Sequence, residues 1–71
     1  MFGKMVVYRP TSAALAAHKA RGGAQLPREI HVLADGGVVA CYDGLGDVHF
    51  AAIDGVFDKH GLSRTELEQI P

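Results

Sequence analysis

Hydrophobic and polar residues alternate along residues 29–53, as they do in β-strands that bury one side. Asp35-Gly36 lies between two apolar runs of this stretch, and Asp-Gly is the preferred centre of a two-residue hairpin turn. Residues 43–46, Asp-Gly-Leu-Gly, supply a second loop. The pattern therefore predicts a three-stranded antiparallel meander, which the rest of the chain covers.

A two-residue turn at Asp35-Gly36 fixes which strand residues lie opposite one another. Because side chains alternate along a strand, the turn sorts the meander into two faces. The uniformly apolar face, which we expect to be the core, comprises Ile30, Val32, Ala34, Val39, Cys41, Val48, Phe50 and Ala52. The mixed face comprises Glu29, His31, Leu33, Val38, Ala40, Tyr42, His49, Ala51 and Ile53. A slip of one residue would exchange the two faces.

A strand and a helix are predicted before the meander. Residues 4–8, Lys-Met-Val-Val-Tyr, include two β-branched valines and an aromatic tyrosine, and Pro10 ends the strand because it cannot donate a hydrogen bond to a neighbour. A helix then runs from Thr11 or Ser12 to about Arg21, where two glycines end it. Leu15 lies opposite a stripe of alanines, and we expect Leu15 to be buried; the alternative is an exposed contact residue. The stripe comprises Ala13, Ala16, Ala17 and Ala20.

Two short helices are predicted after the meander. Asp54 caps the first, which ends at Gly61. Ser63 and Glu66 form a capping-box pattern that predicts a last helix to Ile70. The expected order is β-α-β-β-β-α-α, an α+β fold in a single domain spanning residues 1–71. Its three-stranded antiparallel meander packs against helices, and the N-terminal strand can join it as a fourth strand.

A chain of 71 residues has a small core, and such cores are commonly reinforced by a disulfide, a metal or self-association. Cys41 is the only cysteine, so no disulfide forms within the chain. Homodimerisation stays open. The first residues do not form a secretory signal, and no apolar run reaches the roughly 20 residues of a membrane span. We therefore expect a cytoplasmic protein that does not enter a membrane.

Charge is divided along the chain. Residues 1–34 hold five cations against one acid, and residues 35–71 hold seven acids against two cations. This division of charge can simply reflect ordinary solvated surface, an explanation that accounts for it as well as a functional one. A functional reading is a dipolar surface, with the acidic pole meeting a basic partner or the basic pole meeting nucleic acid.

The chemistry-bearing residues do not assemble into a recognisable catalytic pattern. The expected register buries Cys41 away from His31 and His49, and a buried thiol without a cationic neighbour is inert. The histidines lack metal-site spacing, and the Gly-Leu-Gly loop at 44–46 is not a nucleotide-binding motif. We expect no enzyme activity, no cofactor and no metal.

Nucleic-acid binding is the second hypothesis. Residues 57–70 have the apolar spacing of a helix-turn-helix, but Glu66 and Glu68 on its second helix would repel phosphate. The alternative function therefore relies on this helix-turn-helix-like C-terminus or on the basic N-terminal half. The cations of that half that would contact nucleic acid are Lys19, Arg21 and Arg28.

The leading prediction is a non-catalytic protein-binding module. An inhibitor or adaptor is one concrete form, for example a small phage or mobile-element protein that blocks a host defence protein. The sequence names neither the partner nor the organism. The expected binding surface combines the mixed sheet face with the acidic second loop and the residue after it. Its members are His31, Leu33, Val38, Ala40, Tyr42, His49, Ile53, Asp43 and Asp47.

Overall fold

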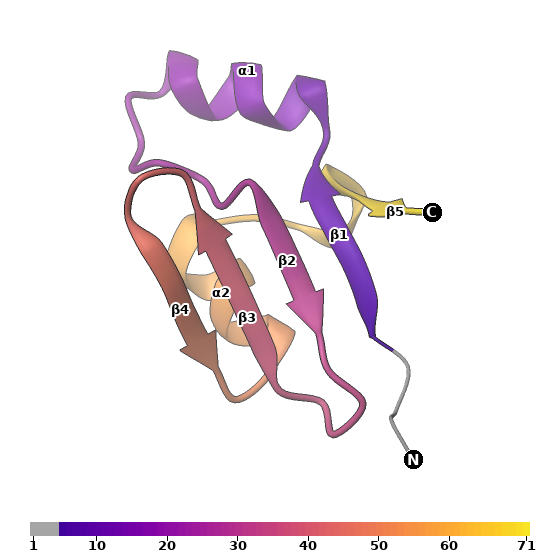
Figure 1. Ribbon diagram of the computed structural model, residues 1–71. Helices are drawn as coiled ribbons and strands as arrows, with labels where there is room; N and C mark the ends of the chain where they lie inside the picture. The colour runs from indigo at the N-terminus through magenta and orange to yellow at the C-terminus, as the bar shows by residue number, and fades with distance from the viewer. Residues whose placement is uncertain (1–4) are drawn as a thin grey trace.

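The computed structural model describes residues 5–71, which form an α+β fold with a five-stranded antiparallel sheet (Figure 1). The elements are β1 (Val6–Pro10), α1 (Ser12–Ala20), β2 (Glu29–Val32), β3 (Val38–Tyr42), β4 (Gly46–Phe50), α2 (Ile53–His60), a 3-10 turn (Arg64–Glu66) and β5 (Leu67–Ile70). The strands lie in the order β4-β3-β2-β1-β5. The predicted meander is present as β2-β3-β4, and β1 joins it as the fourth strand. Lys4, the first residue of the predicted N-terminal strand, lies outside the described residues.

The predicted C-terminal helix is wrong, because residues 67–70 form a strand that pairs with β1. The capping box does form: the Ser63 N–H donates to Glu66 Oε1 over 2.9 Å. It supports only the 3-10 turn, after which Leu67 is extended. So short a helix would be marginal, whereas a strand gains backbone partners along the outer edge of β1. The structure therefore places no recognition helix at the C-terminal end.

The hairpin between β2 and β3 holds one more residue in its loop than a two-residue turn allows. Leu33 N–H donates to the Gly37 carbonyl over 2.8 Å, so the loop comprises the three residues 34–36. Gly36 has a φ of +92°, the glycine conformation that closes three-residue hairpin loops. Val38 consequently lies opposite Val32, one position away from the expected register.

The hairpin between β3 and β4 shows the same shift. Tyr42 lies opposite Gly46, which leaves a three-residue loop in place of the predicted four. Val48 therefore lies opposite Ala40 and not Cys41. Both shifts act on β3, so its two faces are exchanged relative to the prediction, while β2 and β4 keep theirs.

The core lies between one face of the sheet and α2, which crosses behind β2, β3 and β4 in Figure 1. Val38 and Ala40 are 1% and 0% exposed, and Tyr42 is also buried. Their assignment to the mixed face is wrong, and so is the assignment of Val39 and Cys41 to the core. The half-buried Ile53, also expected on the mixed face, starts α2 and packs against the core. Residues correctly placed on the core side are Ile30, Val32, Val48 and Phe50.

Helix α1 does not cover the sheet but lies across one end of it, above β2 and β3 in Figure 1. Its N-cap is Thr11, whose Oγ1 accepts from the Ala14 N–H over 3.0 Å. Ala14 and His18, four residues apart on one side of the helix, are its buried residues. Leu15 is 48% exposed, so its expected burial is wrong. The alanine stripe is exposed as well.

Candidate functional site

A groove of about 550 Å³ lies beneath α1, between this helix and the segment that leads into β2. We call it the α1 groove. It forms because α1 spans the ends of the strands and contacts the rest of the protein through few buried side chains. Its lining residues are Arg9, Pro10, Leu15, His18, Lys19, Gly23, Ala24, Gln25, Leu26, Pro27, Arg28 and Asp43.

His18 holds α1 to the far wall of the groove. Its Nε2 lies 2.5 Å from the Ala24 carbonyl, and its Nδ1 lies 3.2 Å from an Arg21 guanidinium nitrogen. A carbonyl only accepts and a guanidinium only donates, so in these contacts Nε2 donates to Ala24 and Nδ1 accepts from Arg21. A Cβ at Gly23 would overlap this ring. The glycine is therefore required for the chain to pass close to His18.

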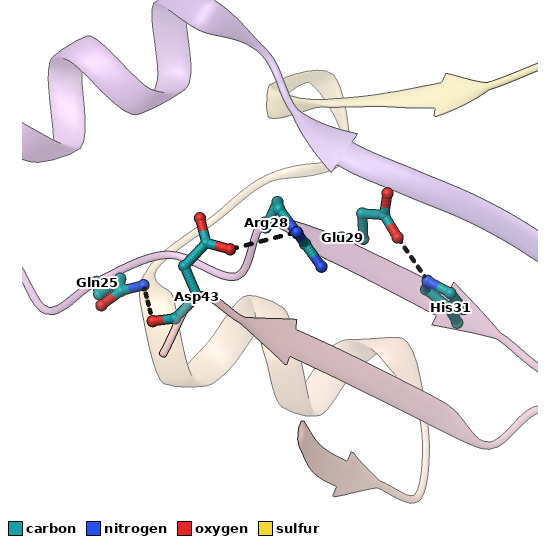
Figure 2. Close-up of polar contacts among 5 residues, drawn as sticks. All are labelled: Gln25, Arg28, Glu29, His31 and Asp43. Carbon is teal, nitrogen blue, oxygen red and sulfur yellow. Dashed lines mark hydrogen bonds and ion pairs between the residues drawn. The ribbon is translucent and has the colours of Figure 1, made fainter. Parts of the chain in front are cut away.

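Three cations surround the groove, and two of them already have acidic partners. Arg9 Nε lies 2.7 Å from Glu68 Oε2, across the β1–β5 pair. Arg28 lies 3.4 Å from Asp43, whose carbonyl accepts from the Gln25 side chain over 3.1 Å (Figure 2). Both ion pairs are well exposed, so each contributes little to stability. Their cations can therefore exchange these carboxylates for those of a ligand.

The floor of the groove is apolar. Leu26 and Pro27 are buried there, Pro10 lies beside them, and Leu15 extends from α1 above. No phenylalanine, tyrosine or tryptophan lines it. An apolar floor beneath a cationic rim suits a ligand with both aliphatic groups and carboxylates.

The face of the sheet opposite α2, which we call the open face, has a different character. Its central row runs across the sheet through Ile70, Val7, His31, Val39 and His49, as the strand register shows. His31 Nε2 lies 2.9 Å from Glu29 Oε1, and this hydrogen bond lowers the pKa of Glu29 (Figure 2). The face is a mixture of half-buried aliphatic side chains and polar side chains.

Cys41 lies on the open face and is half-buried, not in the core as predicted. Burial raises the pKa of its thiol, and the nearby Asp47 carboxylate adds to the shift. The thiol is therefore held in its protonated, unreactive form at neutral pH.

The structure separates the surface residues that the sequence grouped together. Val38, Ala40 and Tyr42 are buried and cannot form an exposed patch. Most of the others lie in three places: His31, His49 and Asp47 on the open face, Leu33 beside the β2–β3 loop, and Asp43 in the α1 groove. Asp43 lines the α1 groove, whereas Asp47 lies on β4.

The cations proposed for nucleic-acid binding are partly brought together. Lys19 and Arg28 both line the α1 groove, while Arg21 contacts His18. Sequence reasoning missed Arg9 and the apolar floor. One signal in the sequence pointed to the groove: Leu15 lies on the side of the helix away from the alanine stripe. Whether this leucine is exposed, however, depends on where α1 lies relative to the sheet.

Within residues 5–71, no three histidine, cysteine or acidic side chains are placed to hold a metal ion. No helix in this range is long and apolar enough to cross a membrane. In comparisons with known proteins, the chain matches no protein family, no curated protein and no solved structure.

Proposed function

We propose that the chain is a non-catalytic protein-binding module, and that the α1 groove binds a segment of the partner that carries both aliphatic and acidic side chains. The observation that carries this proposal is the composition of the groove. Leu15 and Leu26 offer aliphatic contacts, and Arg9, Lys19 and Arg28 offer positive charge at the rim. Apolar contact supplies most of the affinity in such sites, and charge selects the partner.

The exposed surface of α1 supports the same proposal. Four alanines and Leu15 are exposed on this nine-residue helix. An exposed apolar helix beside a groove is typical of a protein-binding surface. Covering it with a partner would remove the apolar area from water. Depending on which surface of the partner is covered, the outcome is inhibition or adaptor-like bridging.

Nucleic-acid binding is the second candidate, favoured by the presence of Lys19 and Arg28 in the same groove as Arg9. Two observations favour protein instead. Arg9 and Arg28 are already paired with carboxylates, as they would be with an acidic peptide. The groove is also lined by no phenylalanine, tyrosine or tryptophan, the side chains on which single-stranded bases most often stack.

The test is a titration of isotope-labelled protein, followed by backbone amide chemical shifts. The probes are an amphipathic peptide of leucine and glutamate, the same peptide with lysine in place of glutamate, and a single-stranded oligonucleotide. We expect the glutamate peptide to shift amides of residues 15–28, and the lysine peptide to leave them unchanged. Tighter binding of the oligonucleotide, with a steep loss of affinity on adding salt, would establish the second candidate instead.

Two pairs of variants locate the surface. Leu15→Glu and Leu45→Glu place the same charge at exposed leucines, but only Leu15 lines the α1 groove. Leu15→Glu should abolish peptide binding, and Leu45→Glu should retain it. Lys19→Glu should also weaken binding, whereas Lys19→Arg should not. Equal binding by Leu15→Glu and the unmodified protein would contradict the proposal.

A further inference from the structure

Strand β4 forms one edge of the sheet, with β3 on one side and no strand on the other within residues 5–71. Alternate N–H and C=O groups of an edge strand point away from the sheet and can pair with another strand. The sequence of β4 is Gly46-Asp47-Val48-His49-Phe50. This edge is separate from the α1 groove, so an interface at β4 does not depend on the proposed function.

The side chains of β4 divide between the two faces of the sheet. Asp47 lies opposite Cys41, and His49 lies opposite Val39, so both are on the open face, where they are exposed. Val48 lies between them on the face that α2 covers. An acid and a histidine thus flank one central residue symmetrically.

We propose that two copies of the chain join through antiparallel pairing of their β4 strands, centred on Val48. In that pairing, Asp47 lies directly opposite His49 of the second copy, and the twofold symmetry repeats the contact. Opposite charges across a strand pair are favourable when the imidazole is protonated, and the same pair can share a hydrogen bond when it is neutral. The edge of the strand is therefore complementary to itself.

The side chains select this register over its neighbours. A twofold pairing must place one residue opposite its own copy, because directly opposed residues share a face. Centring the pairing on Asp47 would oppose two carboxylates. Centring it on His49 would oppose two imidazoles. Centring it on Val48 opposes two small aliphatic side chains and places each acid against a histidine.

The ends of the strand fit the same arrangement. The pairing places Gly46 opposite Phe50 of the second copy. No atom lies within 4 Å of the position that a Cβ at Gly46 would occupy, so there is room beside it for an aromatic ring. An aromatic side chain across from a glycine is a recurrent stabilising pair in sheets. The two five-stranded sheets would then form one continuous sheet, with α2 of each copy on the same side.

Charged residues on an edge strand can also serve the opposite purpose, by preventing edge-to-edge association. Substitutions at His49 and Asp47 distinguish the two roles, because both residues are exposed and outside the core. His49→Asp opposes two carboxylates at each contact. His49→Lys keeps opposite charges together at every pH near neutrality. The exchange Asp47→Lys with His49→Asp restores complementarity with the signs reversed.

The experiment measures mass by sedimentation equilibrium over a series of protein concentrations, with circular dichroism to confirm folding. We expect a dimer whose dissociation constant rises at least about tenfold in His49→Asp, since the repulsion acts at two symmetric contacts. His49→Lys and the exchanged double variant should dimerise. Gln69→Asp, which adds a carboxylate to an exposed position on the opposite edge strand, β5, should dimerise as well.

Three results would overturn the proposal. The first is a monomer at every concentration. The second is a dimer that His49→Asp leaves unchanged, which would place the interface elsewhere. The third is a loss of dimer in His49→Asp that the double variant does not restore, because the Asp47–His49 complementarity would then not determine the pairing.

Discussion

The Tyr42 hydroxyl lies 2.6 Å from Nε2 of His60, and both side chains are buried. Tyr42 ends β3 and His60 ends α2, so this hydrogen bond joins the helix to the sheet beside the core. Burial lowers the pKa of His60, with the positive charge of Lys59 and the nearby His18 contributing. Burial also raises the pKa of Tyr42. Both shifts favour the uncharged forms, so the hydrogen bond joins a neutral phenol and a neutral imidazole.

Removing this hydroxyl should destabilise the protein. Tyr42→Phe leaves the His60 nitrogen buried without its hydrogen-bond partner, at a cost of about 1–3 kcal/mol of unfolding free energy. Tyr8→Phe is the matched control, because its hydroxyl accepts from Arg64 at an exposed site. Urea unfolding of both variants measures the difference. Equal effects of the two substitutions would show that the buried hydrogen bond contributes no more to stability than the exposed one.

Stability should depend on pH through His60. Because its pKa is lowered on folding, the unfolded chain takes up this proton more readily than the folded protein. The stability that depends on a neutral His60 is fully present above the ordinary histidine pKa of about 6.5. It is lost as the pH falls from there to the folded-state pKa. The groups facing His60 are Tyr42, His18 and Lys59.

Urea unfolding across about pH 5.5 to about 7.5 tests this dependence, because carboxylates and tyrosines titrate outside that range. We expect the free energy of unfolding to rise with pH over this interval. In His60→Gln, which keeps a polar side chain but does not titrate, the rise should be smaller. An unchanged slope in His60→Gln would assign the dependence to the other histidines.

The one-residue shift of the meander can be tested with neighbouring valines. Val38 is 1% exposed in the core, whereas Val39 lies half-buried on the open face. Val38→Asp buries an unpaired charge, and its cost should exceed about 4 kcal/mol, most of the stability of so small a domain. Val39→Asp should remain folded, as circular dichroism and thermal melting would show. The reverse outcome would restore the register that a two-residue turn predicts.

The sequence predicted the three central strands and the first two helices, because alternation, Pro10 and the glycines after each helix are local signals. It could not fix the register of β3. Asp35-Gly36 is compatible with a two-residue turn or with a three-residue loop that includes Ala34, and both choices bury a continuous apolar face. The structure adopts the three-residue loop, which buries Val38, Ala40 and Tyr42.

Pairing with β1 determines the secondary structure of the C-terminal segment. The capping box at Ser63 is a true helix-start signal, and it forms. Residues 67–70 then pair with the edge of β1 in place of continuing a helix. This pairing joins residues far apart in the sequence, since Pro10 and Leu67 are separated by 57 positions. The α1 groove escaped prediction for a related reason. It depends on α1 lying across the strand ends, which no local pattern encodes.

The attachment of α1 can be tested at Gly23. A Cβ at this position would overlap the His18 ring, so Gly23→Ala should displace the imidazole from the Ala24 carbonyl. We expect a loss of about 1–3 kcal/mol, the usual cost of overpacking. Hydrogen exchange should show the earliest loss of protection in α1, because few other contacts hold this helix.

His18→Ala removes the ring and with it the obstacle to the added methyl group. If steric overlap is the cause, Gly23→Ala should cost much less in the His18→Ala background than in the unmodified protein. Such non-additivity is the signature of two residues in contact. Equal costs in both backgrounds would contradict steric overlap with His18 as the cause. Loss of glutamate-peptide binding in Gly23→Ala would further connect the position of α1 with the groove beneath it.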